Sequence, residues 1–241
     1  MALKEISRSA TCAFCPTEPL IAMGTMAGAV DLSFSTNSTI EVFHVDMSST
    51  DSTFPSYSSA KVNERFNRLV WGKAKGLPWG IIAGGLADGT ICIWDPSPKV
   101  SPKPLSTMSH HGGPVRGLDF NSFSHNLLAS GGSEGDVVIW DLTTPTKPSK
   151  YPALKSGAAT SNNEISCLAW NGKVNHILAS ADFSGQTVVW DLKKQRPVIS
   201  FHDPSVRRRC SALGWSPDQA TQLIVASDDD RSPTLQVRVH F

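Results

Sequence analysis

The chain has 241 residues, a formal net charge of +1 and only 18% charged residues. This balance provides no global basic field for nucleic acid, so no nucleic-acid partner is expected. The five cysteines form no dense framework, which indicates free thiols in a reducing compartment. The N-terminus lacks the apolar core of a signal peptide, and no run approaches the roughly 18 apolar residues of a membrane span. We therefore expect a soluble cytoplasmic protein.

A repeated phrase organises the chain. Residues 127–142 begin with an apolar run that ends in small residues, pass through a Gly-rich turn and return as a β-branched run, which predicts a β-hairpin. The phrase recurs at residues 81–95 and 177–192. Its three copies end in Trp94-Asp95, Trp140-Asp141 and Trp190-Asp191. These tryptophans are 46 and 50 residues apart, close to the roughly 40 to 45 residues of a WD-repeat blade.

Two further windows at the same period keep the strand pattern and lose the Trp-Asp pair, at Phe43-His44 and Arg238-Val239. The chain is therefore expected to be an all-β WD-repeat β-propeller with about five blades, each of four strands. The expected blades span residues 5–60, 61–109, 110–155, 160–203 and 204–241. Short strands precede the hairpins at residues 67–71, 114–120, 164–170 and 210–215, and outer strands are expected at 104–108, 150–154 and 197–201. The Ser/Thr-rich stretch 47–59 and the Pro-rich stretch 96–104 are predicted to be exposed loops.

Each buried tryptophan adds a large apolar area and an indole N–H that needs a partner. In WD-repeat proteins the partners are usually a Ser or Thr on the preceding strand, a His from the loop before the blade and an acid in the turn. The third repeat supplies nearly the full set: Ser130, His110 or His111, Glu134 and Trp140. The second repeat has Gly84 at the Ser position, and the fourth has Ser184 where the acid would stand. We expect structural networks that are incomplete outside the third repeat.

Five segments carry a more specific resemblance, and they include the repeats without Trp-Asp. They are FSTNSTIEVF (34–43), RLVWG (68–72), GPVRGLDFN (113–121), EISCLAWN (164–171) and ASDDDRSP (226–233). Together they resemble the Sec thirty-one family, the large outer-cage subunit of the COPII vesicle coat. The resemblance implies a non-enzymatic scaffold in vesicle budding and endoplasmic reticulum to Golgi transport. It further implies other COPII coat subunits as protein partners and peripheral membrane association, through the coat, at endoplasmic reticulum exit sites and on COPII vesicles.

The family's propeller has seven blades, followed by a partner-binding segment, a Pro-rich region and a helical domain. This chain departs from that pattern at residues 238–241, where Arg-Val-His-Phe stands in place of Trp-Asp-Leu. An incomplete, open arc is therefore expected, and an alternative transcript or a truncated gene model would explain it. Uncovered end blades predict low stability and a tendency to associate. The alternative functions are a WD-repeat adaptor of a ubiquitin-ligase or chromatin complex, and a non-functional truncated isoform.

Other constellations are interpreted as structural. Cys12 and Cys15 have C-x-x-C spacing without a second pair, and residues three apart on a strand face opposite sides. The His110-His111 pair and His125 lack further ligands on rigid elements, so no metal site is expected. No nucleophile–base arrangement or phosphate-binding loop can be assembled. We expect no enzyme, no cofactor and no small-molecule substrate.

One basic and one acidic run stand out: Arg207, Arg208 and Arg209, and Asp228, Asp229 and Asp230. Charge runs in loops are usually solvated surface. The alternative is partner docking, because a propeller holds such loops rigidly. The basic run is expected in the loop before the fifth blade, and the acidic run in the turn between its middle strands.

Overall fold

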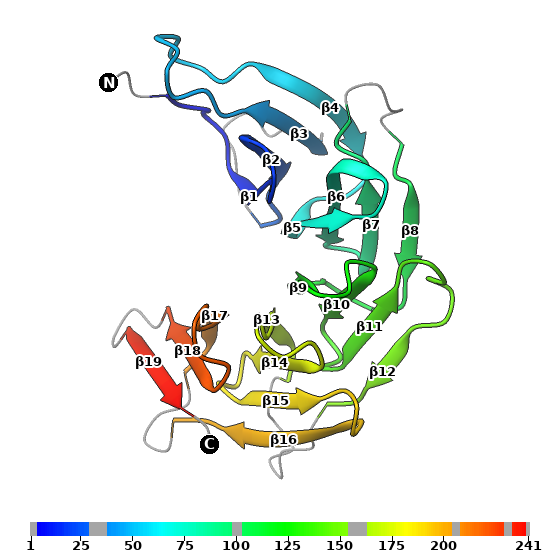
Figure 1. The fold of residues 1–241 in the computed structure, drawn as a ribbon, viewed down its shortest axis with the longest axis vertical. Coiled ribbons are helices and arrows are strands. Elements are labelled where there is room, and N and C mark those ends of the chain that lie inside the picture. Colours follow the sequence, from blue (N-terminus) through cyan, green and yellow to red (C-terminus); the bar gives the residue numbers. More distant parts are fainter. Residues whose placement is uncertain are drawn as a thin grey trace. The chain divides into compact units, whose positions relative to one another are not determined.

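The described residues form β-strands joined by turns and loops (Figure 1). The computed structural model describes residues 4–28, 38–97, 103–153, 163–203, 208–228 and 233–239. Within these ranges there are five antiparallel sheets of three or four strands. The described residues contain no helix, and therefore none that is long and apolar enough to cross a membrane. This confirms the predicted all-β class with blade-like repeats. The chain divides into two compact units, residues 1–109 and 110–241, which are described separately.

The first unit holds two four-stranded sheets, in each of which consecutive strands are neighbours. The first sheet consists of β1 (Ala10–Phe14), β2 (Leu20–Thr25), β3 (Ser38–His44) and β4 (Ser56–Val62). The second consists of β5 (Phe66–Ala74), β6 (Leu77–Leu86), β7 (Thr90–Trp94) and β8 (Ser106–Ser109). Buried side chains of both sheets, including Leu20, Val42, Phe66 and Trp94, form one hydrophobic core.

The second unit holds three sheets. The third sheet consists of β9 (Gly117–Phe120), β10 (Leu127–Gly131), β11 (Val137–Asp141) and β12 (Ser149–Tyr151). The fourth consists of β13 (Ile165–Trp170), β14 (Ile177–Asp182), β15 (Thr187–Asp191) and β16 (Arg196–Phe201). The fifth consists of β17 (Cys210–Trp215), β18 (Gln222–Ser227) and β19 (Thr234–Val239). All are antiparallel meanders, as a blade requires.

The strand register shows that the five sheets are equivalent repeats. Ile82, Leu128 and Leu178 lie opposite Trp94, Trp140 and Trp190. The same ladder position pairs Ile21 with Phe43 in the first sheet and Leu223 with Arg238 in the fifth. The ladders therefore confirm that Phe43 and Arg238 occupy the position of the missing tryptophans.

One predicted loop is partly a strand. The stretch 47–59 was expected to be exposed loop, yet β4 begins at Ser56 and pairs with β3 along its length. An outer strand has one sheet neighbour and lies at the surface, so it needs backbone hydrogen bonds more than apolar side chains. In β4 only Ala60 is buried. Of the predicted loop 96–104, residues 98–102 lie outside the described residues.

Hydrophobic contacts join consecutive sheets of the second unit. Ala129 and Val137 of the third sheet pack with Leu168 and Trp190 of the fourth. Val189 of the fourth sheet belongs to a separate cluster that includes Leu223 and Trp215 of the fifth, with Leu223 fully buried. A single blade cannot cover both of its faces, so these clusters are the main source of its stability.

Two buried asparagines repeat the same link between sheets. Asn121 follows β9 and donates from Nδ2 to the carbonyl of Asn175, in the turn between β13 and β14 of the fourth sheet, at 2.9 Å. Asn171 follows β13 and donates to the carbonyl of Ala220, in the turn between β17 and β18 of the fifth sheet, at 2.8 Å. The Oδ1 atom of each accepts two backbone N–H groups of its own turn; for Asn171 these belong to Lys173 and Val174. Each amide therefore holds a turn and a neighbouring sheet at once.

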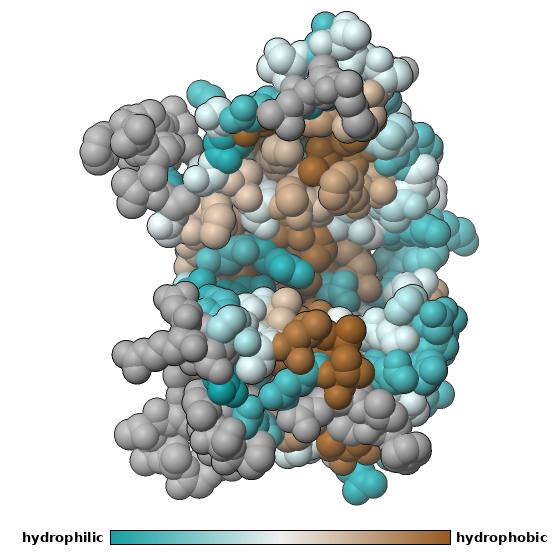
Figure 2. All heavy atoms as spheres, turned by 90° about the vertical axis from the view of Figure 1, so that its left-hand side faces the viewer, coloured by the Kyte–Doolittle hydropathy of each residue, from teal (hydrophilic) through white to brown (hydrophobic). Residues whose placement is uncertain are grey.

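The outer face of the fifth sheet is apolar and exposed. Leu235 and Val237 of β19 are 70% and 58% exposed, and Ile224 of β18 lies opposite Val237 in the ladder. Figure 2 shows apolar side chains, in brown, gathered over these strands in its lower half. The other face of the sheet packs on the fourth sheet through Leu223. The expected association of the chain through its end blades stays a prediction, and this face is where it would occur.

The Asn171→Ala substitution tests the amide link. It removes three hydrogen bonds at a buried site and leaves the Ala220 carbonyl without this donor. We expect a loss of about 1–3 kcal/mol in the free energy of unfolding, measured by urea denaturation. Asn175→Ala is the control, because the Asn175 side chain is exposed and its carbonyl remains in place. Equal effects of the two substitutions would show that the link does not stabilise the stack.

Candidate functional site

The third sheet holds a hydrogen-bonded chain of three buried side chains. Trp140 Nε1 donates to Ser130 Oγ at 2.8 Å, and His111 Nε2 lies 2.8 Å from the same oxygen. Ser130 and the His111 side chain have no exposed surface. Burial lowers the pKa of His111, which favours the neutral imidazole. Of the two candidate histidines, the structure places His111 against Ser130, and the His110 ring packs edge-on against Trp140.

Two carboxylates face the far side of the His111 ring. His111 Nδ1 lies 3.7 Å from Glu134 Oε2 and 3.9 Å from Asp136 Oδ1. Glu134 also accepts the backbone N–H of Gly112. Gly135 between the acids has a φ of 76°, a left-handed conformation that favours glycine, and this tight turn lets both carboxylates reach the ring.

Sequence reasoning named Glu134 and missed Asp136. Asp136 directly precedes the β-branched run of β11 and lies within the hairpin predicted at residues 127–142. Its carboxylate is 4% exposed and lies 2.8 Å from Lys150 Nζ, and this hydrogen bond raises the pKa of Lys150. His110 Nε2 is 3.8 Å from the same oxygen of Asp136. The sequence did contain a signal for this contact, because Asp136 is a second acid two residues after Glu134.

The fourth sheet has a shorter network. Trp190 Nε1 donates to Ser180 Oγ at 2.9 Å. Ser184 stands at the turn position that Glu134 occupies in the third sheet, and its hydroxyl donates to Asp182 Oδ1 at 2.7 Å. The backbone N–H of Gln186 donates to the same oxygen. Asp182 therefore holds this turn from the strand side.

The second sheet lacks the serine because an aromatic ring fills its place. Trp94 Nε1 is buried and has no hydrogen-bond partner among the described residues. A Cβ atom at Gly84 would lie 2.5 Å from the Phe66 ring and 2.9 Å from the Trp94 ring. Phe66 has no exposed surface, and its ring centroid is 5.7 Å from that of Trp94. Aromatic packing replaces the polar network at this position.

The aspartates of the Trp-Asp pairs shape the turns that follow them. Asp95 accepts the backbone N–H of Ser97. Asp141 accepts from the Asn126 side chain and from Thr143, and these hydrogen bonds lower its pKa. The backbone N–H of Lys194 likewise lowers the pKa of Asp191. These side chains are structural, as turn-capping aspartates commonly are.

Two tryptophans that sequence reasoning left aside bind the neighbouring sheet. Trp170 of β13 donates from Nε1 to the carbonyl of Asp119 in β9, at 3.1 Å, and its backbone N–H reaches the Asp119 carboxylate at 2.7 Å. Trp215 of β17 donates to the carbonyl of Ala169 in β13, at 3.0 Å. The available signal was the Trp that the second, fourth and fifth sheets share at one ladder position, Trp71, Trp170 and Trp215. The third sheet has Phe120 there.

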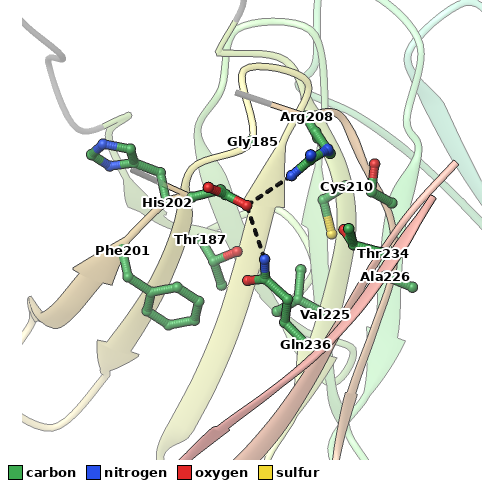
Figure 3. Close-up of a pocket in the computed structure, with 12 residues that line it drawn as sticks. Gly185, Thr187, Phe201, His202, Arg208, Cys210, Val225, Ala226, Thr234 and Gln236 are labelled. Atoms are coloured by element: carbon green, nitrogen blue, oxygen red, sulfur yellow. Dashed lines mark hydrogen bonds and ion pairs between the residues drawn. The ribbon is translucent and has the colours of Figure 1, made fainter. Parts of the chain in front are cut away.

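The basic run borders a small pocket between the fourth and fifth sheets (Figure 3). Arg208 donates from Nη1 to Asp203 Oδ2 at 2.8 Å, and the Gln236 amide donates to the same oxygen at 3.1 Å. Cys210 lines the pocket as well, with its thiol 3.5 Å from that of Cys167. Hydrogen bonding to Cys167 and burial raise the pKa of the Cys210 thiol. Arg207 lies outside the described residues, as do Asp229 and Asp230 of the acidic run.

Arg209 is the exposed member of the described basic run. Its guanidinium lies 4.6 Å from the centre of the Phe183 ring and 3.7 Å from Asp228. Arg116 lies 5.4 Å from the same ring and pairs with Glu164 at 2.6 Å. The structure thus brings the described ends of the two charge runs together beside an aromatic ring.

All five cysteines are free thiols. Cys12 lies in β1 and is exposed, whereas the Cys15 thiol points toward the carbonyl of Trp79 at 3.8 Å. Neither is part of a group of metal-ligand side chains in the described residues.

Comparison with known proteins gives consistent matches. The WD domain, G-beta repeat family model matches residues 102–141. The chain is 50% identical over 244 residues to "Protein transport protein SEC31 homolog B" of Arabidopsis thaliana, covering 98% of this chain and 22% of the relative. It is 41% identical over 248 residues to human "Protein transport protein Sec31A", covering 98% and 20%. The chain thus spans about a fifth of the length of these relatives.

A solved structure agrees with these relatives. A chain of "COPII on membranes, outer coat vertex" superposes with a TM-score of 0.77 and 30% sequence identity. The match covers 96% of this chain and 61% of that one.

Two serine substitutions test the unequal networks. Ser180→Ala removes the partner of Trp190 alone, whereas Ser130→Ala removes a partner of both Trp140 and His111. Each buried polar group left unpaired costs about 1–3 kcal/mol. We expect Ser130→Ala to lower the free energy of unfolding by at least about 1 kcal/mol more than Ser180→Ala, measured by urea denaturation. Indistinguishable costs would mean that His111 adds nothing to the third network.

Proposed function

We propose, on the premise that this chain is similar to Sec31 proteins over 98% of its length, that it is a non-enzymatic scaffold of the COPII outer coat. In this role it acts in vesicle budding and in transport from the endoplasmic reticulum to the Golgi, through protein contacts of its propeller blades. It works in the cytoplasm and reaches membranes of endoplasmic reticulum exit sites and vesicles through the coat. The carrying observation is the match along nearly the whole chain, including repeats without Trp-Asp.

The geometry of the networks supports a scaffold better than an enzyme. Ser130 and His111 are a hydroxyl and an imidazole within hydrogen-bond distance, which in an open cleft would suit a nucleophile and its base. Ser130 is fully buried, and its oxygen accepts the Trp140 indole N–H. A substrate could not reach this oxygen without unpacking the blade. The polar groups here hold strands together, and the role uses no cofactor, small-molecule substrate or nucleic acid.

The loops around Phe183 are the proposed contact surface. Arg209 has 57% of its side chain exposed and stacks on Phe183, so its guanidinium is held in place while remaining accessible. Asp228 is half-exposed and only 3.7 Å away, a distance at which a partner's carboxylate can compete for Arg209. We assign this surface to an acidic face of another coat subunit. Arg207, Asp229 and Asp230 are proposed to belong to it as well.

Binding to the assembled coat tests both the proposed coat function and the proposed contact surface. The full chain, fluorescently labelled, is mixed with liposomes bearing reconstituted COPII coat and with bare liposomes, and flotation is measured. We expect it to float only with coated liposomes. Arg209→Glu is expected to reduce binding about tenfold, because it places like charges opposite the partner. Lys193→Glu is the matched control, since Lys193 is exposed on the turn after β15, where only its backbone N–H bonds Asp191.

The outcomes separate the proposals. If the unmodified chain does not float with coated liposomes, the coat function is wrong. If it floats and Arg209→Glu binds as well as Lys193→Glu, the function stands and the contact surface lies elsewhere.

A further inference from the structure

We propose that Cys167 and Cys210 form an oxidation site, at which a peroxide converts the two thiols into a disulfide that joins the fourth and fifth sheets. This inference is independent of the coat function. Cys167 lies in β13 and Cys210 is the first residue of β17, and both side chains are buried. The sequence predicted free thiols without indicating which of them are neighbours. The structure brings these two together across the interface between the sheets.

The two sulfur atoms are close enough to bond after a small movement. Cys167 Sγ lies 3.5 Å from Cys210 Sγ, and the S–S bond of a disulfide is about 2.05 Å long. The sulfurs must therefore approach each other by about 1.5 Å, which rotation about the two Cα–Cβ bonds can supply. The other three cysteines, Cys12, Cys15 and Cys92, belong to the first unit. Residues 110–241 contain no third cysteine that could compete for either sulfur.

The backbone at equivalent positions comes as close as a disulfide requires. By ladder position, Cys167 and Cys210 correspond to Gly117 of the third sheet and Ile165 of the fourth. A Cβ atom at Gly117 would lie 2.9 Å from Cγ2 of Ile165, which is one bond of about 1.5 Å from the Ile165 Cβ. These Cβ atoms are therefore at most about 4.4 Å apart, and disulfides have Cβ separations of about 3.5–4.5 Å. The same interface geometry between the fourth and fifth sheets favours the cross-link.

A small pocket gives an oxidant access to Cys210. The pocket lies between the fourth and fifth sheets, is lined by Cys210 and Arg208, and has a volume of about 30 Å³ (Figure 3). A water molecule needs roughly 10–15 Å³, so hydrogen peroxide, which is only slightly larger, can enter. His202 lines the pocket and is exposed, so the pocket reaches the surface. A tripeptide thiol such as glutathione is too large to follow.

The reaction consumes one peroxide for each pair of thiols. Cys210 loses its proton to water and attacks one oxygen of hydrogen peroxide, so that an S–O bond forms, the O–O bond breaks and hydroxide leaves. The Cys167 sulfur then attacks the Cys210 sulfur: the S–S bond forms, the S–O bond breaks, and the hydroxyl group leaves with the Cys167 proton as water. The thiols lose two electrons, and the peroxide is reduced to two water molecules. Hydrogen bonding to Cys167 and burial raise the pKa of the Cys210 thiol, so the reaction is slow at neutral pH.

The disulfide fastens a sheet whose outer face is uncovered. It links residues 43 apart in the chain, and such a cross-link restricts the unfolded segment between them. Leu213 and Val225 of the fifth sheet already pack around the thiol pair, so the bond reinforces an existing contact. Local opening of the fifth sheet then becomes rarer, which slows the hydrogen exchange of its amides. Once formed, the bond is shielded from thiol reductants that the pocket excludes.

The test is overnight treatment of the folded full chain with excess hydrogen peroxide at neutral pH, followed by mass spectrometry of its tryptic peptides. Cys167 and Cys210 fall in different tryptic peptides, so the disulfide is detected as a linked pair. We expect that pair, and we expect the amides of β17 and β18 to exchange at least tenfold more slowly after oxidation. Cys92→Ala is the matched control, because Cys92 is a buried thiol of the first unit, and this variant should form the same link. Cys210→Ala should abolish both the link and the slower exchange.

The unmodified chain decides the question, so the proposal does not depend on the folding of a variant. Oxidation of the exposed Cys12 shows that the oxidant was sufficient. If Cys12 is oxidised while Cys167 and Cys210 remain unlinked, the proposal is wrong, whether the two thiols stay reduced or Cys210 ends as a sulfinic acid. A link that leaves the exchange of β17 and β18 unchanged would overturn the claim that it fastens the fifth sheet.

Discussion

Every stable part of this molecule depends on one sheet covering the next. In the second unit, hydrogen bonds as well as hydrophobic contacts join consecutive sheets. Trp170 and Trp215 reach back to backbone carbonyls of the preceding sheet, and Asn121 and Asn171 reach forward to the following one. Because these bonds join backbone to side chain across the interface, they fix the register of the stack, while the hydrophobic clusters supply most of its free energy.

The buried tryptophans of the three Trp-Asp hairpins are held in different ways. In the third sheet Trp140 is held by a polar chain through Ser130 and His111, and in the fourth Trp190 by Ser180 alone. In the second sheet Phe66 has taken the space of the hydroxyl, and Gly84 is the only residue that fits beside it. The incomplete network of the second sheet is thus a repacked aromatic interface.

Repetition made much of this predictable. Three Trp-Asp hairpins at a blade's spacing determine the strand order and register, and Phe43 and Arg238 follow from the same period. The strand β4 was missed because pairing along β3 satisfies its backbone, a contact that no side-chain pattern in Ser56–Val62 records. Asp136 was missed because its approach to His111 depends on the conformation of Gly135, which residue spacing does not contain. Contacts made by turns and by neighbouring sheets are therefore the hardest to predict from sequence patterns.

If the packing of one sheet on the next is the source of stability, the amides of a strand should be better protected from hydrogen exchange when both faces of its sheet are covered. The fourth sheet is packed on both sides within the second unit, whereas β18 and β19 present Ile224, Leu235 and Val237 to solvent. Native-state hydrogen exchange of the full chain measures this strand by strand. The account predicts that amides of β14 and β15 exchange slowest in this unit and those of β18 and β19 markedly faster. Equal protection of the fourth and fifth sheets would contradict it.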